Sequence, residues 1–172
     1  GLAMIHAPRG LGKSWFVLSM TTALTTGGCF LKWAASSPVG VLVVDGEMDL
    51  AELRDRIVAL AQPVPIAPLR VLSHQHVFDR ESADMNFGHM AWQERLKTYL
   101  KGAPEIRVVV LDNLSCLLPT TPEDKRDDWA RDVLPFLIWL RRRGIAVVLV
   151  HHSSKSGGQR GSSAREDQLD TT

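Results

Sequence analysis

Short apolar runs alternate along this chain with stretches that carry apolar residues at helical spacing. Continuous runs of β-branched and aliphatic residues are typical of strands buried on both faces of a parallel sheet. The predicted strands are residues 2–7, 41–44, 70–73, 108–111 and 145–150, and the predicted helices are residues 13–26, 49–61, 90–101 and 127–143. Alternation of this kind requires right-handed crossovers. The sequence therefore predicts an α/β fold, a mostly parallel sheet with helices on both faces.

The segments between these elements are more polar. Residues 29–33 predict a short extended piece, and the prolines at 63, 65 and 68 predict a loop. Residues 74–88 are polar and poorly periodic, so we expect a surface connection there. Residues 119–125 predict a polar loop, and the Ser- and Gly-rich residues 153–163 predict a mobile tail.

Composition excludes several classes of protein. The 172 residues suit one domain, and with 45% apolar and 23% charged residues the chain is not disordered as a whole. Twenty basic against nineteen acidic residues exclude a strongly basic nucleic-acid-binding domain, although not a local basic patch.

The two cysteines are too few for a disulfide framework, which favours a protein of the reducing cytoplasm. We expect both cysteines to be buried inside the folded protein. No apolar run is long enough for a membrane span, and the N-terminus lacks the basic region followed by an apolar stretch that marks a signal peptide. The start at Gly1, inside an apolar run, suggests a piece of a larger protein.

The strongest chemical signal is a phosphate loop between the first strand and the first helix. The motif reads Ala7-Pro8-Arg9-Gly10-Leu11-Gly12-Lys13-Ser14, with alanine at its usual first glycine. Gly10 and Gly12 would let backbone N–H groups close around a phosphate chain. Lys13 would reach the β- and γ-phosphates, and the Ser14 hydroxyl would bind Mg²⁺. Alanine at position 7 costs little if that position needs no positive φ. A Gly-rich turn with a chance Lys-Ser pair is the alternative.

Acidic residues follow two of the buried strands, at the edge where open α/β sheets bind ligands. Asp112 follows the strand at 108–111, a suitable place for a carboxylate that holds Mg²⁺. Asp45 and Glu47 follow the strand at 41–44, and either could point into the site. Glu47 is the better base, because Gly46 frees the backbone to aim a carboxylate at water. Capping or surface roles are the alternatives for these acids.

Basic side chains lie at the end of the last strand and beyond it. His151 and His152 face opposite ways if both are extended, so at most one points at a nucleotide. We expect His152 to sense the γ-phosphate, with a structural histidine as the alternative. Beyond it, the tail around Lys155 to Arg165 could grip a DNA backbone or reach a neighbouring subunit. Arg160 is the candidate arginine finger, with Arg165 as its rival, and a DNA contact or a solvated linker as the alternatives.

The combined motifs resemble the RecA-type ATPases. The phosphate loop, Asp45-Gly46-Glu47-Met48, Asp112-Asn113, His151-His152-Ser153-Ser154-Lys155 and Arg160-Gly161-Ser162-Ser163 occur in this order. The chain is most similar to the RepA-like replicative helicases of plasmids and phages, including the ATPase halves of primase-helicases. The resemblance runs from residue 1 to 170. It departs from the family at Ala7, where the family often has glycine. The chain also stops at residue 172, where family members continue into further strands, so we expect the C-terminal strands of the sheet to be truncated.

The resemblance implies roles and partners. Glu47 would be the catalytic carboxylate, Asp112 the partner of Mg²⁺ and His152 the sensor. A homo-hexameric ring would place active sites between subunits and single-stranded DNA in its central channel. We therefore expect residues 1–172 to form a RecA-like ATPase core that uses ATP and Mg²⁺ as part of a replicative DNA helicase. The alternatives are a non-motor ATP-dependent switch or loader, a RecA-type recombinase core and, with less support, a small-molecule kinase.

Overall fold

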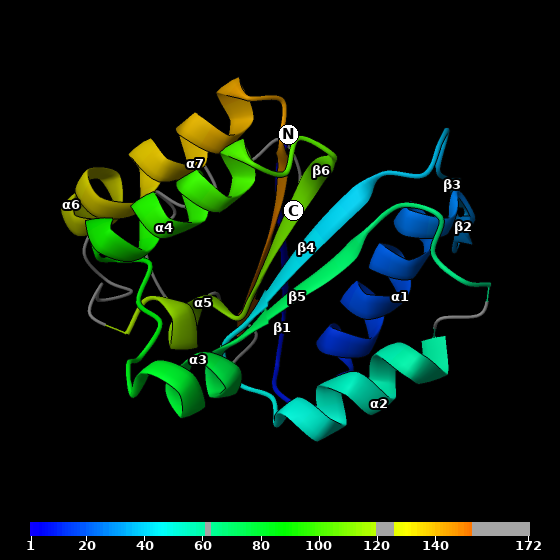
Figure 1. The fold of residues 1–172 in the computed structure, drawn as a ribbon, viewed down its shortest axis with the longest axis horizontal. Helices are drawn as coiled ribbons and strands as arrows, with labels where there is room; N and C mark the ends of the chain where they lie inside the picture. Colours follow the sequence, from blue (N-terminus) through cyan, green and yellow to red (C-terminus); the bar gives the residue numbers. More distant parts are fainter. Residues whose placement is uncertain (61–62, 120–125, 153–172) are drawn as a thin grey trace.

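The computed structural model describes residues 1–60, 63–119 and 126–152, and its centre is a five-stranded parallel sheet (Figure 1). The strands are β1 (Leu2–Ala7), β4 (Gly40–Asp45), β5 (Leu69–Ser73), β6 (Ile106–Asp112) and β7 (Ala146–His152). Their order in the sheet is β1-β7-β6-β4-β5, and every neighbouring pair is parallel. The predicted α/β fold is confirmed.

Helices cover both faces of this sheet. They are α1 (Lys13–Thr26), α2 (Leu50–Leu60), α3 (His74–Glu81), α4 (Met90–Lys101), α5 (Leu114–Leu117), α6 (Arg126–Asp128) and α7 (Leu134–Arg142). Figure 1 shows α1 and α2 on one side of the sheet and α4 and α7 on the other. No helix within the described ranges combines the length and the apolar character that crossing a membrane requires.

Side chains of each strand alternate between two separate hydrophobic clusters. In β4, Leu42 and Val44 pack in the larger cluster with α4 and α7, whereas Val41 and Val43 pack with Val17 of α1 in the smaller one. Successive side chains of a strand point to opposite faces of the sheet. An apolar residue is therefore needed at each position from Val41 to Val44, which explains the continuous apolar run in the sequence.

The prediction of a surface connection over residues 74–88 is wrong. Residues 74–81 form α3, and Met85 and Phe87 are fully buried in the larger cluster. The Phe87 ring stacks on Phe136 of α7 with 6.1 Å between ring centroids, and its N–H donates to the Leu117 carbonyl. Two buried residues two positions apart give no helical period, so the sequence pattern did not reveal them.

The single helix predicted over residues 127–143 is also corrected, because α6 and α7 are joined by a π-helical turn, Trp129–Val133. The N–H of Leu134 reaches the carbonyl of Trp129, five residues back. Pro135 lies in the first turn of α7. Proline has no N–H and would clash with the carbonyl four residues earlier in a regular helix. A wider turn at this point is consistent with that constraint.

Residues 29–33 belong to a small hairpin rather than to one extended piece. Strands β2 (Cys29–Phe30) and β3 (Trp33–Ala34) pair antiparallel, and Leu31 between them has a φ of 52°. Cys29 is exposed here, and Cys116 in α5 is only half-buried. The expectation that both cysteines are buried is therefore wrong.

Candidate nucleotide site

The carboxyl ends of four strands meet at one edge of the sheet and bring the predicted site together. Asp45, Asp112 and His152 are the last residues of β4, β6 and β7, and Ala7 is the last residue of β1. In the parallel register Asp45 pairs with Asp112, and Ala7 pairs with His152. Ala7 and His152, which are 145 positions apart in the sequence, therefore lie at the same edge of the sheet.

The glycines of the phosphate loop adopt the backbone conformation that the motif requires. Gly10 and Gly12 have φ values of +83° and +78°, in the left-handed region that favours glycine. A Cβ atom added at either residue would meet nothing within 4 Å, so the loop encloses open space rather than packed side chains. Ala7 is extended at the end of β1, and the non-glycine residues with positive φ in the described ranges are Leu31 and Ser82. Alanine therefore replaces the usual glycine at position 7 without backbone strain.

Lys13 is held inside the loop. Its Nζ donates hydrogen bonds to the carbonyl oxygens of Ala7 at 2.7 Å and Pro8 at 2.8 Å. The residue is buried, and burial lowers the pKa of the ammonium while the Asp112 and Glu47 carboxylates act in the opposite direction. These contacts position a cation where a polyphosphate would enter the loop.

Ser14 and Asp112 form the pair that fits a magnesium ion. The Ser14 hydroxyl donates a hydrogen bond to the Asp112 carboxylate, which favours its charged form, whereas burial raises the pKa of Asp112. A hydroxyl and a carboxylate are hard oxygen ligands, and Mg²⁺ is usually held by few protein oxygens while it keeps several waters. The donor set therefore fits Mg²⁺, with Ser14 and Asp112 as the residues that would hold it.

Glu47, Asn113 and His152 form a polar cluster across three strand ends. The Asn113 Nδ2 donates to Glu47 Oε2 and lies 3.1 Å from His152 Nε2, which is itself 3.3 Å from Glu47 Oε2. Asn113 is buried, while the Glu47 side chain is 47% exposed. His152 thus points toward the site, and its neighbour His151 is fully buried. Asn113 was given no role in the sequence analysis, although its position directly after Asp112 at a strand end was a usable signal.

Asp45 holds the turn that follows β4. Its Oδ1 accepts hydrogen bonds from the N–H groups of Met48 at 2.8 Å and Glu47 at 3.2 Å. Burial outweighs these bonds and raises the pKa of Asp45 to about 7. This arrangement fits the capping alternative for Asp45 and orients the backbone that carries Glu47.

Gly46 is required for a different reason from the one that we expected. It has no positive φ, but an added Cβ would lie 2.9 Å from Cδ2 of Leu117 and 3.0 Å from Cβ of Cys116. Helix α5 therefore packs directly on this turn. The glycine allows a close approach between β4 and α5 rather than an unusual backbone angle.

These residues surround a pocket of about 480 Å³. Among the predicted residues, those that line it are Arg9, Gly10, Gly12, Lys13, Ser14, Asp45, Glu47, Asp112 and His152. Leu11 is 69% exposed at the surface of the loop. The pocket also includes Trp15 and Arg56, two residues that belong to none of the sequence motifs. Lys155, Arg160 and Arg165 lie outside the described residues.

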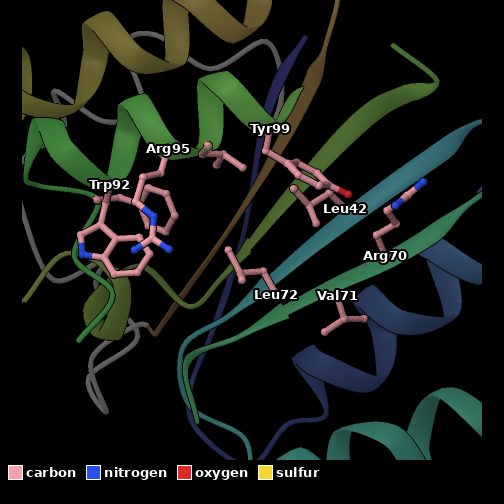
Figure 2. Close-up of a pocket in the computed structure, with 9 residues that line it drawn as sticks. Leu42, Arg70, Val71, Leu72, Trp92, Arg95 and Tyr99 are labelled. Atoms are coloured by element: carbon pink, nitrogen blue, oxygen red, sulfur yellow. The ribbon is translucent and has the colours of Figure 1, made fainter. Parts of the chain in front are cut away.

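A second cavity, of about 370 Å³, lies between α4 and the edge of the sheet. Figure 2 shows Trp92, Arg95 and Tyr99 from α4 on one side of it, and side chains of β4 and β5 on the other. Its walls are mainly apolar, and Arg95 is already paired with both carboxylate oxygens of Glu81. This cavity contains none of the phosphate-loop residues, so it is separate from the nucleotide site.

Comparison with known proteins gives a family match that covers most of the chain. The family model described as AAA domain matches residues 1–158. No match was found among the curated proteins.

Proposed function

The chain belongs to the AAA domain family of P-loop ATPases, and from this premise we propose that it is the ATPase core of a DNA helicase. The observation that supports hydrolysis is the meeting of Lys13, Ser14, Glu47 and Asp112 around one pocket. Phosphoryl transfer to water depends mainly on positioning and charge stabilisation. These needs are met by a phosphate cradle that contains Lys13, an oxygen pair for Mg²⁺ and the Glu47 carboxylate.

Each residue has a distinct task in the proposed reaction. Lys13 binds the β- and γ-phosphates, and the backbone N–H groups of the loop hold the phosphate chain. Glu47 orients the attacking water and accepts its proton, while Asn113 fixes the position of the carboxylate through its hydrogen bond. The Mg²⁺ held by Ser14 and Asp112 would neutralise charge that develops on the phosphates.

The motor part of the proposal rests on the resemblance to RepA-like replicative helicases. His152 contacts both Glu47 and Asn113, so it is suited to transmit the state of the γ-phosphate. The segment from Lys155 to Arg165 contains three basic residues and no acidic one, and it is proposed to contact single-stranded DNA in a homo-hexameric ring. Arg160 is proposed to act on the nucleotide of the adjacent subunit.

Phosphate release from Mg·ATP, measured with and without single-stranded DNA, tests this function. We expect DNA to stimulate hydrolysis and Lys13→Ala to abolish it, because the cation at the β- and γ-phosphates is lost. Strand separation on a tailed duplex then tests the motor. ATP binding without hydrolysis would instead favour a switch or loader, and phosphate transfer to a small acceptor would favour a kinase.

A further inference from the structure

We propose that the indole ring of Trp15 stacks on the base of the bound nucleotide, with Arg56 bracing its other face. This inference rests on the proposed function, because it assigns the base subsite of the same pocket. Trp15 and Arg56 both line the 480 Å³ pocket that contains the phosphate loop. The Arg56 guanidinium lies 5.2 Å from the centroid of the Trp15 ring.

The position of Trp15 along α1 places it next to the phosphate-binding amides. The first N–H groups of a helix have no acceptor within the helix and form an anion site. The N–H of Phe16 already donates to the Gly12 carbonyl, so the available amides of α1 end at Trp15. A base is joined to its phosphates through one ribose, so it must lie near the end of this array of amides.

The ring of Trp15 is fixed in place although it is not part of the core. Neither hydrophobic cluster includes Trp15, and the residue is 42% exposed. Arg56 holds the ring by a cation–π contact and is itself held by an ion pair with Glu52, one turn earlier in α2. A planar side chain that is fixed and half-exposed offers a preorganised stacking surface.

The next residue along the helix shows what a packing role looks like in this protein. Phe16 is also exposed, at 39%, but it turns to the hairpin and packs edge-to-face on Phe30, with ring centroids 4.7 Å apart. Phe16 lines a different, apolar pocket together with Trp33. Trp15 instead faces a pocket that contains Lys13, Glu52 and Arg56. The pocket also contains Arg9 and the Asp112 carboxylate that would hold Mg²⁺, so a ligand with an aromatic part and a Mg²⁺-bound polyphosphate fits these surroundings.

Two probes separate the base from the phosphates. Calorimetry measures the binding of Mg·ATP and of Mg·tripolyphosphate, which has the phosphates but no base. We expect Trp15→Ala to weaken ATP binding by about 10-fold or more, in line with the usual contribution of base–aromatic stacking. Its affinity for tripolyphosphate should stay within about twofold of the wild type, and Trp15→Phe should retain much of the ATP affinity. Trp33→Ala, which removes an exposed indole outside the phosphate pocket, is the matched control and should change neither affinity.

The outcomes distinguish this inference from the proposed function. Equal ATP affinity in the wild type and Trp15→Ala would overturn the stacking role and leave the ATPase assignment intact. Parallel losses for ATP and tripolyphosphate in both Trp15 variants would also overturn it, because they indicate damage to the phosphate loop. If the wild type bound neither probe, the proposed function would fail together with this inference.

Discussion

Glu47 is the residue on which hydrolysis should depend most directly. Glu47 and the nearby Asp45 both line the phosphate pocket, but the Asp45 carboxylate accepts hydrogen bonds from the backbone of its own turn. We expect Glu47→Gln to keep ATP binding and to slow hydrolysis by about 10²-fold or more, which is typical for loss of a general base. Single-turnover phosphate release and ATP titration measure the two effects. Asp45→Asn is the control, and an Asp45→Asn enzyme that is slower than Glu47→Gln would show that the base was wrongly assigned.

Asn113 should act on catalysis through Glu47. Its Nδ2 donates to Glu47, and its Oδ1 accepts from the Cys116 N–H at the start of α5. Asn113→Asp keeps the acceptor for α5 but replaces the donor facing Glu47 with a carboxylate oxygen. We expect slower hydrolysis with ATP affinity nearly unchanged, and a smaller loss of thermal stability than in Asn113→Ala, which also loses the helix cap. If both variants hydrolysed ATP at the wild-type rate, Asn113 would have no role in positioning Glu47.

A buried side chain of α4 connects this helix to the segment before it and to the π-helical turn that precedes α7. The amide of Gln93 in α4 donates to the carbonyls of Phe87 at 2.7 Å and Asp132 at 2.6 Å, and the residue is only 6% exposed. Gln93→Ala leaves two carbonyls without this donor, so we expect the free energy of unfolding to fall by about 1–3 kcal/mol. Chemical denaturation measures the loss. The neighbouring Glu94→Ala, at an exposed position, should change it by no more than about 0.5 kcal/mol.

The free energy of unfolding should depend on pH because of Asp45, the last residue of β4. Its pKa is raised from an ordinary value of 3.8 to about 7 by burial. Between these values the folded chain keeps a proton that the unfolded chain has released, so this contribution to stability is lost as pH rises toward 7. We expect the loss to be on the order of 2–4 kcal/mol. Denaturation in magnesium-free buffer from pH 5 to 8 measures it. Asp45→Asn should show a flatter profile, and an unchanged profile would mean that another group titrates.

On the scale of the whole assembly, the prediction concerns Arg160 and the neighbouring subunit. Arg160→Ala subunits keep an intact phosphate loop, and Lys13→Ala subunits keep an intact arginine. If Arg160 stabilises charge on a γ-phosphate in trans, mixed assemblies should recover part of the ATPase activity that neither variant has alone. Steady-state hydrolysis across a series of mixing ratios measures this recovery. Full DNA-independent activity of Arg160→Ala alone would remove the arginine finger assignment.

The sequence by itself determined the layers of the fold and most members of the site. Continuous apolar runs such as 41–44 specify strands buried on both faces, and alternation with helices then requires a parallel sheet. The phosphate loop is a local motif whose glycines set the backbone angles directly, so its geometry follows from eight adjacent residues. Asp112 and Glu47 were found because parallel strands end at a common edge of the sheet.

Only the tertiary structure decided which contacts cross between elements. Met85 and Phe87 are buried because α4, α5 and α7 surround them, and no local period marks such residues. The need for glycine at position 46 comes from the close approach of α5. The contact of Asn113 with Glu47 depends on the register of β4 and β6. The contact of Trp15 with Arg56 depends on the packing of α1 against α2. Each of these contacts joins residues that lie far apart in the chain. Their distance and orientation are set by the packing of whole elements, which local sequence patterns do not specify.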